Sequence, residues 1–294
     1  MEYSSNSDKI TRDYFDSLLL ESRYIDSDLP STKLELYGRS FDTPVMTAAL
    51  SHLGNTAENG MVIYAQAAAK ANAVHWVGMG EDKELEDITA TGAATIKIIK
   101  PHADNKEVFR KIEHAKKAGC FALGMDIDHA FNGSGGYDNV LGLPMKPKTT
   151  EELHDFVDAA EIPFIVKGVL STKDAEKCLK AGCKGIQLSH HHGIMQYAVP
   201  PLMMLPEILQ VTRGEIPVFI DCGIESGMDV YKCLALGATA VSVGRHLMPL
   251  LKEGADKTAG RIKEMTGELA ATMARTGVKD LKSFDPTVIH QRRF

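Results

Sequence analysis

The chain has 294 residues and a net charge of −6, so its length fits one α/β barrel of roughly 250 residues with an extension, and its acidity argues against a nucleic-acid-binding surface. Its apolar runs are too short to cross a membrane, and the polar start at residues 1–8 lacks the pattern of a signal peptide. The five cysteines include no C-x-x-C pair and indicate reduced, mostly buried thiols of a cytoplasmic protein.

The chain begins with an extension, residues 1–43, ahead of the first buried strand. Apolar residues repeat with helical spacing between positions 9 and 24 and predict an amphipathic helix. Alternation over residues 34–37, followed by the glycine-containing segment 38–41, predicts a small hairpin. We expect this hairpin to plug the bottom of a barrel.

Eight short apolar runs follow, separated by helix-length segments. This alternation predicts βα units and a parallel sheet that is buried on both faces. We therefore predict a TIM (β/α)8 barrel in a single domain over residues 1–294. The expected strands are residues 44–49, 74–79, 95–99, 121–127 and 164–169, followed by the runs 185–193, 218–223 and 240–245, each of which ends in a polar or glycine-containing turn. The expected helices are residues 60–71, 82–88 with Asp82 as N-cap, 105–118, 151–160, 171–181, 227–236 and 254–276.

One connection differs from the others. Residues 131–148, after the fourth strand, contain glycines and prolines that preclude regular structure. A loop of this length in a compact barrel is typical of a functional segment. We expect it to form a mobile cover over the site.

Two glycine-containing turns follow the seventh and eighth strands, residues 223–227 and Gly244-Arg245. In TIM barrels the active site lies at the C-terminal ends of the strands, and the loops after strands 7 and 8 frequently hold a phosphate. Glycine lets backbone N–H groups approach an anion, and the Arg245 guanidinium offers two donors. This pattern predicts a cofactor that carries a phosphate.

Polar residues end several of the apolar runs, where the barrel mouth would be. Burying a lysine without a partner is costly, so we interpret Lys167 as a cation beside an electron-accepting ring or an anionic oxygen rather than as a structural salt bridge. Ser189 and His191 are two apart on the sixth strand and should point the same way. His191 is a candidate general base, the alternative being a hydrogen-bonded structural histidine. Adjacent histidines on a strand point to opposite faces, so the run His190-His191-His192 predicts no metal site.

Four further charged residues are candidates for the site. Asp221 follows the seventh strand and could hydrogen-bond the sugar-like chain of a cofactor or pair with a cation. Asp126 and Asp128 share one side of the fourth strand, and they could orient a base or a ring or serve the structure alone. Lys97 could face the mouth or extend along the surface.

Together these residues resemble the FMN-dependent α-hydroxy acid oxidase and dehydrogenase family, which includes glycolate oxidase and lactate oxidase. The resemblance extends from the N-terminal helix to the tail and is strongest over residues 163–249. It implies a compact TIM barrel that binds FMN at its C-terminal face and forms a homo-oligomer, often a tetramer. Its motifs are Ile165-Val166-Lys167-Gly168, Val199-Pro200 with Leu205-Pro206-Glu207-Ile208, Asp221-Cys222-Gly223-Ile224 with Gly227-Met228-Asp229-Val230, Leu234-Ala235-Leu236-Gly237-Ala238, and Val243-Gly244-Arg245.

The resemblance also implies roles for particular residues. Lys167 would contact the N1/O2 edge of the flavin and stabilise the negative charge of its reduced form. The histidine that takes the hydroxyl proton or the α-proton, while electrons reach the flavin, maps to His191, or to His192 if the His-Gly pair is aligned. Its carboxylate partner maps to Asp128. The expected FMN contacts are Asp221, Gly223, Gly244 and Arg245 for the ribityl chain and phosphate, and Ala49, Leu50, Gly78 and Ser189 near the ring, with Lys97 and Asp126 as further candidates.

The sequence departs from the family at the substrate end. The arginine that binds the substrate carboxylate is replaced by Ile194, or by Met195 in the alternative register. Loss of a bidentate arginine removes the main group that would bind a 2-hydroxy acid. Lys97, His52 or His192 could supply another anion contact. The other departures are Glu225 for a phosphate-binding arginine, Lys97 and Ile99 for a glutamine and a tyrosine on the third strand, and Cys222 for a glycine beside Asp221.

The resemblance implies an FMN-dependent oxidoreductase that oxidises a small 2-hydroxy acid, such as lactate or glycolate, and transfers two electrons to the flavin. One alternative is an FMN-dependent reductase or isomerase that acts on a different substrate. Another is a flavin-free barrel that binds a different phosphorylated ligand, which Glu225 near the phosphate turn suggests. The expected partner is a small molecule, with no nucleic acid and no membrane.

Overall fold

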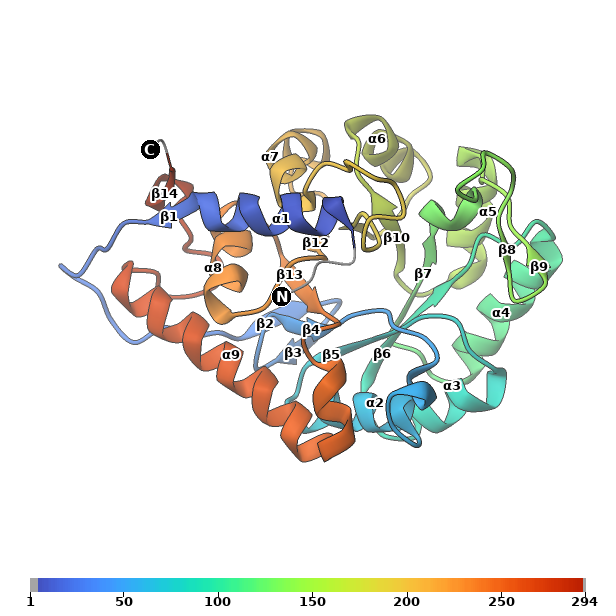
Figure 1. Cartoon of the computed structure of the whole chain (residues 1–294), viewed down its shortest axis with the longest axis horizontal. Coiled ribbons are helices and arrows are strands. Elements are labelled where there is room, and N and C mark those ends of the chain that lie inside the picture. Colours follow the sequence, from blue (N-terminus) through green and yellow to red (C-terminus); the bar gives the residue numbers. More distant parts are fainter. Residues whose placement is uncertain (1–4, 293–294) are drawn as a thin grey trace.

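An eight-stranded parallel sheet forms the centre of the structure, a computed structural model that describes residues 5–292 (Figure 1). Neighbouring strands follow one another in sequence order, and a parallel bridge between Leu50 and Val77 joins the two ends of the sheet. The predicted TIM barrel is therefore confirmed. The strands are β4 (Val45–Thr47), β5 (Val74–Val77), β6 (Ala94–Ile99), β7 (Ala122–Asp126), β10 (Phe164–Val169), β11 (Gly185–Leu188), β12 (Val218–Ile220) and β13 (Ala240–Val243). Residues 1–4 of the predicted extension and residues 293–294 of the predicted tail lie outside the described residues.

Helices cover the outer face of the barrel, where their apolar sides and the outward side chains of the strands form one core cluster. The helices are α2 (Gly60–Lys70), α3 (Asp82–Thr89), α4 (Asn105–Lys117), α5 (Thr150–Ala160), α6 (Thr172–Lys180), α7 (Pro201–Thr212), α8 (Gly227–Ala235) and α9 (Ala255–Arg275). The sequence analysis does not predict α7, because Pro206 interrupts its pattern. Asp82 is the first residue of α3 rather than its cap, which is Glu81.

The N-terminal helix α1 (Asn6–Ser17) is shorter than predicted. Residues 18–20 form a strand, β1 (Leu18–Leu20), that pairs antiparallel with β14 (Ile289–Gln291) near the other end of the chain. Helix α1 lies beside α8 and the end of β12 (Figure 1). Its Thr11 hydroxyl lies 2.8 Å from Nε2 of His190, so α1 packs on the C-terminal mouth of the barrel.

The predicted plug is confirmed. Strands β2 (Leu34–Leu36) and β3 (Arg39–Phe41) form an antiparallel hairpin. Leu34, Leu36 and Phe41 are buried with Trp76, Phe219 and other inward side chains of the barrel. This apolar cluster closes the end of the barrel opposite the mouth, because it includes residues from the starts of β5, β6, β7 and β13.

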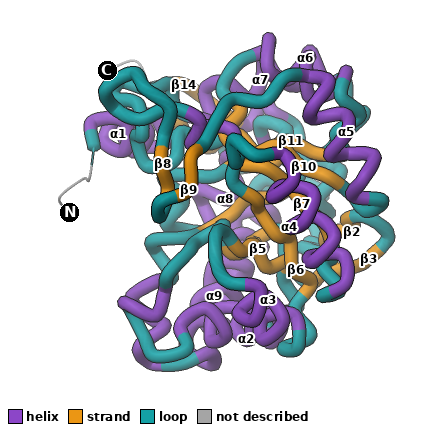
Figure 2. The backbone as a smooth tube through the Cα atoms, turned by 90° about the vertical axis from the view of Figure 1, so that its right-hand side faces the viewer, coloured by secondary structure: helices purple, strands orange, loops and turns teal. Residues whose placement is uncertain are grey.

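The connection over residues 131–148 contains regular structure, so that part of the prediction is wrong. It forms a hairpin of β8 (Asn139–Val140) and β9 (Leu143–Pro144). Both turn residues, Leu141 and Gly142, have positive φ, which is the geometry of a tight two-residue hairpin. Leucine is unusual in that position, which explains why the sequence does not reveal the turn. Figure 2 shows this hairpin and the plug on opposite sides of the barrel strands.

The five cysteines are free and buried, as predicted. Within residues 5–292, none of the helices combines the length and apolar character that a membrane span requires.

Candidate active site

Two cavities at the C-terminal ends of the strands share His192 and Asp221 and thus form one elongated site. The first, of about 320 Å³, lies at the turns after β12 and β13, and the second, of about 240 Å³, lies at the ends of β4 to β7 and β10. The site therefore lies at the predicted face of the barrel.

Both predicted glycine turns line the first cavity. Gly223 has a φ of +74°, and a Cβ there would lie 2.7 Å from Cγ2 of Thr11. A Cβ on Gly244 would lie 3.1 Å from Cβ of Ala48. The turn at Gly223 therefore requires glycine, because helix α1 packs directly against its backbone.

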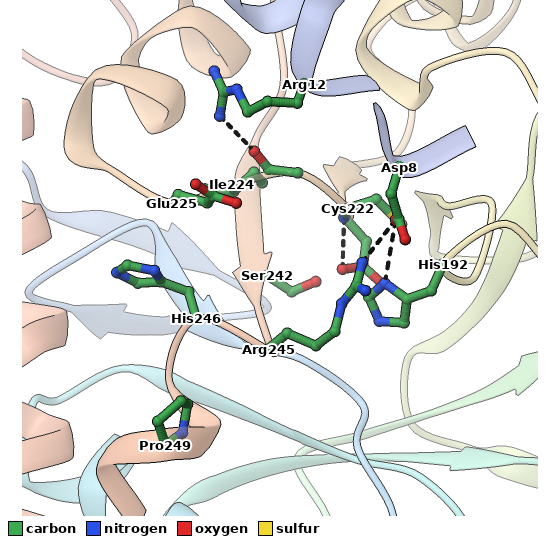
Figure 3. A pocket seen from close by; sticks show the side chains of 13 residues that line it. Asp8, Arg12, His192, Cys222, Ile224, Glu225, Ser242, Arg245, His246 and Pro249 are labelled. Atoms are coloured by element: carbon green, nitrogen blue, oxygen red, sulfur yellow. Dashed lines mark hydrogen bonds and ion pairs between the residues drawn. The ribbon is translucent and has the colours of Figure 1, made fainter. Parts of the chain in front are cut away.

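The N-terminal helix contributes a carboxylate to this cavity, which the sequence analysis does not predict. The Asp8 side chain points toward Arg245 and His192 (Figure 3). Nη2 of Arg245 lies 2.7 Å from Oδ1 of Asp8, and Nδ1 of His192 lies 3.8 Å from the same oxygen. The predicted phosphate-binding arginine therefore faces a protein carboxylate.

Helix α1 also contributes a guanidinium. Arg12 pairs with both carboxylate oxygens of Asp229, at 2.8 and 3.0 Å, and donates to the Gly223 carbonyl at 2.9 Å. The backbone N–H groups of Glu225 and Ser226 donate to Asp229 at 3.1 Å. Asp229 thus accepts hydrogen bonds from these N–H groups at the start of α8. Arg12 and Glu225 both line the first cavity.

The second cavity contains Lys167, at the end of β10. Its Nζ is buried and lies 3.2 Å from Nδ1 of His191 and 3.5 Å from Oδ1 of Asp126. Burial opposes the charge, but the carboxylates of Asp126 and Asp128 outweigh burial and raise the pKa of Lys167 above its usual value. Lys167 is therefore a fixed cation at the centre of the site.

The three consecutive histidines do not lie on a strand, so the argument from strand alternation is wrong. Strand β11 ends at Leu188, and both His191 and His192 have positive φ. The turn is held by a hydrogen bond from the His191 backbone N–H to Oγ of Ser189, at 3.1 Å. It directs His191 toward Asp128 and His192 toward Asp8.

Two carboxylates face the His191 ring. Nδ1 of His191 lies 3.1 Å from Oδ1 of Asp128 and 3.5 Å from Oδ2 of Asp126. Burial and Lys167 disfavour the imidazolium, but hydrogen bonds to the two carboxylates raise the pKa of His191. The structure therefore brings together the predicted residues His191, Lys167, Asp126 and Asp128.

The two aspartates differ in charge environment. Burial acts to raise the pKa of Asp126, but Lys167 and Lys100, whose Nζ lies 2.6 Å from Oδ2, hold it well below its usual range. Burial and the neighbouring charge of Asp126 raise the pKa of Asp128. The sequence analysis does not single out Lys100, although Lys100 directly follows β6 and Lys167 lies near the end of β10.

His129 is a further site residue that the sequence analysis misses. Its Nε2 lies 3.3 Å from Nε2 of His191, and the ring centroids are 4.4 Å apart in an edge-to-face arrangement. Its Nδ1 lies 3.2 Å from Oδ2 of Asp138, just before β8. The position of His129 directly after Asp128 was a signal that could have identified it.

Ligand atoms of Asp126, Asp128, His129 and His191 lie within 4.8 Å of one another, a spacing that could hold a metal ion. The ammonium groups of Lys100 and Lys167 pair with Asp126 in this cluster. Two fixed cations oppose the binding of a third.

The remaining predicted contacts also lie at the site. Oγ of Ser189 donates to Asp221 at 3.2 Å. Ala49, Leu50 and Gly78 line the second cavity. A Cβ on Gly78 would lie 2.4 Å from Oγ of Ser51, so glycine is required where β5 meets the end of β4.

The prediction that Lys97 faces the mouth is wrong. On β6, Ile96 and Ile98 pack inside the barrel, so Lys97 and Ile99 point outward. The Lys97 ammonium donates to the Gly78 carbonyl, and burial lowers its pKa to about 8. The inward residues here are Ile98 and Lys100, both of which line the second cavity.

The sequence pattern of the FMN-dependent dehydrogenase family matches residues 3–157 and 145–291. The chain belongs to this family. It is 25% identical to a 2-hydroxyacid oxidase of Dictyostelium discoideum, over 97% of this chain and 84% of that relative. It is 28% identical to an L-lactate oxidase of Lactobacillus jensenii, over 90% of this chain and 72% of that relative. A solved structure of a mandelate oxidase variant with (S)-mandelic acid superposes with a TM-score of 0.89 at 25% identity, covering 99% of this chain and 91% of that one.

The cofactor of this FMN-dependent dehydrogenase is FMN, and the shape and chemistry of the site fit it. At one end of the elongated cavity lie the two glycine turns and the Arg245 guanidinium. At the other end lies the Lys167 ammonium, together with the apolar residues that follow β4. Nδ1 of His192, between the two cavities, is buried without a hydrogen-bond partner among residues 5–292. A phosphate at one end and an electron-accepting ring at the other match this distribution of donors.

Proposed function

We propose that this flavoprotein oxidises a small 2-hydroxy acid to the corresponding 2-keto acid. The observation that carries the proposal is the contact of His191 with both Lys167 and Asp128, at 3.2 and 3.1 Å. Bound FMN supplies the acceptor of two electrons. The proteins similar to this chain are named as oxidases of 2-hydroxyacids, lactate, glycolate and 4-hydroxymandelate, which supports the substrate class.

His191 would act as the general base. Asp128 accepts from Nδ1–H of His191 and orients the ring, whose Nε2 lies beside His129 at the second cavity. Nε2 would take the substrate proton, and Asp128 and Asp126 would stabilise the resulting imidazolium. We propose His191 rather than His192 for this role because Nδ1 of His192 faces Asp8, at 3.8 Å.

Lys167 would bind the N1/O2 edge of the flavin. Its ammonium stabilises negative charge that develops there when the flavin is reduced. Arg245 and the turns at Gly223 and Gly244 would hold the phosphate, and Asp221 the ribityl chain. Ala49, Leu50 and Gly78 would contact the ring through their backbones.

The test is the visible spectrum of the purified protein before and after anaerobic addition of L-lactate, glycolate and (S)-mandelate in turn. Loss of the flavin band with one of these acids is the expected result. The His191→Gln variant should keep the oxidised spectrum unchanged under the same conditions. A wild-type flavin that none of the acids bleaches would contradict the proposal.

A second candidate is a reductase or isomerase on another substrate, and the position of Ile194 favours it. By the resemblance, the carboxylate-binding arginine of the family maps to Ile194, or to Met195 in the alternative register. The two residues are 43% and 62% exposed, and neither lines either cavity. In that case the flavin would remain oxidised with every 2-hydroxy acid but would respond to another reductant.

We also propose that the protein assembles into a homo-oligomer, as the family resemblance implies. Met195, Tyr197 and Met203, in the segment after β11 and in α7, are exposed apolar side chains that an interface would bury. Light scattering coupled to gel filtration measures the assembly directly. A monomeric mass would contradict this proposal.

A further inference from the structure

Lys100 is a second buried ammonium at the C-terminal mouth of the barrel, and the proposed reaction gives it no role. It directly follows β6 and lines the second cavity together with Lys167 and His191. Its Nζ lies 2.6 Å from Oδ2 of Asp126. Burying an ammonium is costly unless it has partners, so the partners of Lys100 decide what this cation can do.

The carboxylate that faces Lys100 is shared with two other groups. Oδ1 of Asp126 lies 3.5 Å from Nζ of Lys167, and Oδ2 lies 3.5 Å from Nδ1 of His191. Among residues 5–292, Lys100 forms no ion pair with any other carboxylate. Lys100 therefore has no counter-charge of its own, and an added anion at this cavity would be attracted to it.

The Lys100 ammonium also keeps unused hydrogen-bonding capacity. An ammonium has three N–H donors, and Asp126 accepts from one of them. No second acceptor for this ammonium is found in the part of the chain that the structure describes, residues 5–292. Hydrogen bonds between an ammonium and a carboxylate are among the strongest in proteins. A small carboxylic acid in the second cavity would supply the missing acceptor.

Lys100 lies close to the proposed base. Oδ2 of Asp126 lies 2.6 Å from Nζ of Lys100 and 3.5 Å from Nδ1 of His191. The two nitrogen atoms are therefore at most 6.1 Å apart, the sum of these distances. The carboxylate and the hydroxyl of a 2-hydroxy acid are on neighbouring carbons. With a hydrogen bond of about 2.8 Å at each end, such a molecule can contact the ammonium and the imidazole at once.

We propose that Lys100 binds the carboxylate of the substrate and takes the place of the arginine that is absent at Ile194 or Met195. The carboxylate accepts from the N–H groups that Asp126 leaves free, and the substrate hydroxyl faces His191. This inference rests on the proposed oxidation of a 2-hydroxy acid. It adds that the site selects an anionic acid over a neutral alcohol or amide.

The other candidates for an anion contact are less well placed than Lys100. Lys97 points outward to the helices, where its ammonium donates to a backbone carbonyl. His192 faces Asp8, at 3.8 Å, toward the phosphate end. His52 lines the second cavity but is exposed, so water competes for its ring nitrogens. Lys100 alone among these four combines burial, a fixed charge and a place at the second cavity.

The first test uses a 2-hydroxy acid that cannot be oxidised. 2-Hydroxyisobutyrate has no hydrogen on its α-carbon, and 2-hydroxyisobutyramide is its neutral analogue. Calorimetry at neutral pH measures the binding of each to the FMN-loaded protein. Wild type should bind the carboxylate roughly 10- to 100-fold more tightly than the amide, the effect of a hydrogen bond to a charged group. A wild-type protein that does not prefer the carboxylate would overturn the proposal.

Three variants assign this preference to a residue. Lys100→Gln should bind the carboxylate and the amide about equally, and an unchanged affinity for the amide shows that its site is intact. Lys100→Arg should keep the preference, since the charge is kept. Lys116→Gln removes an ammonium that also lies 2.6 Å from a carboxylate, that of Glu161, but lines neither cavity. It should behave as wild type. A full preference in Lys100→Gln, or an equal loss in Lys116→Gln, would contradict the assignment.

The second test is a crystal structure of the FMN-loaded wild-type protein with 2-hydroxyisobutyrate. A carboxylate oxygen should lie within about 4 Å of Nζ of Lys100, the distance of an ion pair. A carboxylate bound elsewhere in the cavity would overturn the proposal. Neither test needs turnover. A flavin that no 2-hydroxy acid reduces would overturn the proposed oxidation, while the preference for the carboxylate still reports on Lys100.

Discussion

Nη2 of Arg245 lies 2.7 Å from Oδ1 of Asp8, so a carboxylate of the N-terminal helix is paired with the arginine of the phosphate turn. The Asp8 side chain is 6% exposed, whereas that of Arg245 is 41% exposed and faces the cavity. An FMN phosphate and the Asp8 carboxylate would both bind this guanidinium, and they would repel each other. We therefore expect the position of α1 to influence the affinity for the cofactor.

Asp8→Asn keeps the shape of this side chain and removes its charge. We expect FMN to bind roughly 1.4- to fivefold more tightly, because partly exposed ion pairs contribute about 0.2–1 kcal/mol. Fluorescence titration of the apoprotein with FMN measures the change. Asp13→Asn, in an exposed pair with Lys9 on the same helix, should leave the affinity unchanged. Equal or weaker FMN binding by Asp8→Asn would show that Asp8 does not compete with the phosphate.

Lys167→Met removes the buried cation at the ring end of the site. The midpoint potential of the bound flavin should fall by roughly 30–60 mV, which corresponds to the loss of one charge-assisted interaction in a two-electron couple. Lys97→Met is the matched control, since Lys97 is buried but points away from the cavity. The midpoint potential of the flavin in Lys97→Met should equal that in wild type. A similar fall in both variants would contradict the assignment of Lys167 to the flavin.

The barrel was predictable because its pattern is local. Each buried strand is a short apolar run, each helix has an apolar side, and the polar residues at the strand ends necessarily meet at one face. Lys167, Asp126 and Asp221 were found in this way. One error concerns which face of a strand a side chain occupies, since moving the alternation by one residue reverses every side chain on the strand. Lys97 was placed in the mouth, although Ile96 and Ile98 occupy the inner face of β6.

The rest of the site depends on contacts between distant segments. Asp8 meets Arg245 across 237 residues, and Arg12 meets Asp229 across 217. No local pattern encodes these pairs, because they follow from how α1 packs on the barrel mouth. His129 and Asp138 were missed for a related reason: an antiparallel bridge between Phe131 and Tyr137 turns the chain back, so that Asp138 meets His129.

Gly168→Ala tests the contact between His191 and Asp128. Gly168 has a φ of +92°, and a Cβ would lie 2.9 Å from Cγ of Asp128. Gly182 has a similar φ of +82°, but a Cβ there would meet its nearest neighbour at 3.7 Å. Both alanine variants should lose about 1–2 kcal/mol of unfolding free energy from backbone strain. Only Gly168→Ala should also slow flavin reduction, by displacing Asp128. Thermal unfolding and anaerobic stopped-flow measure the two effects, and equal rates in both variants would contradict the role of Asp128.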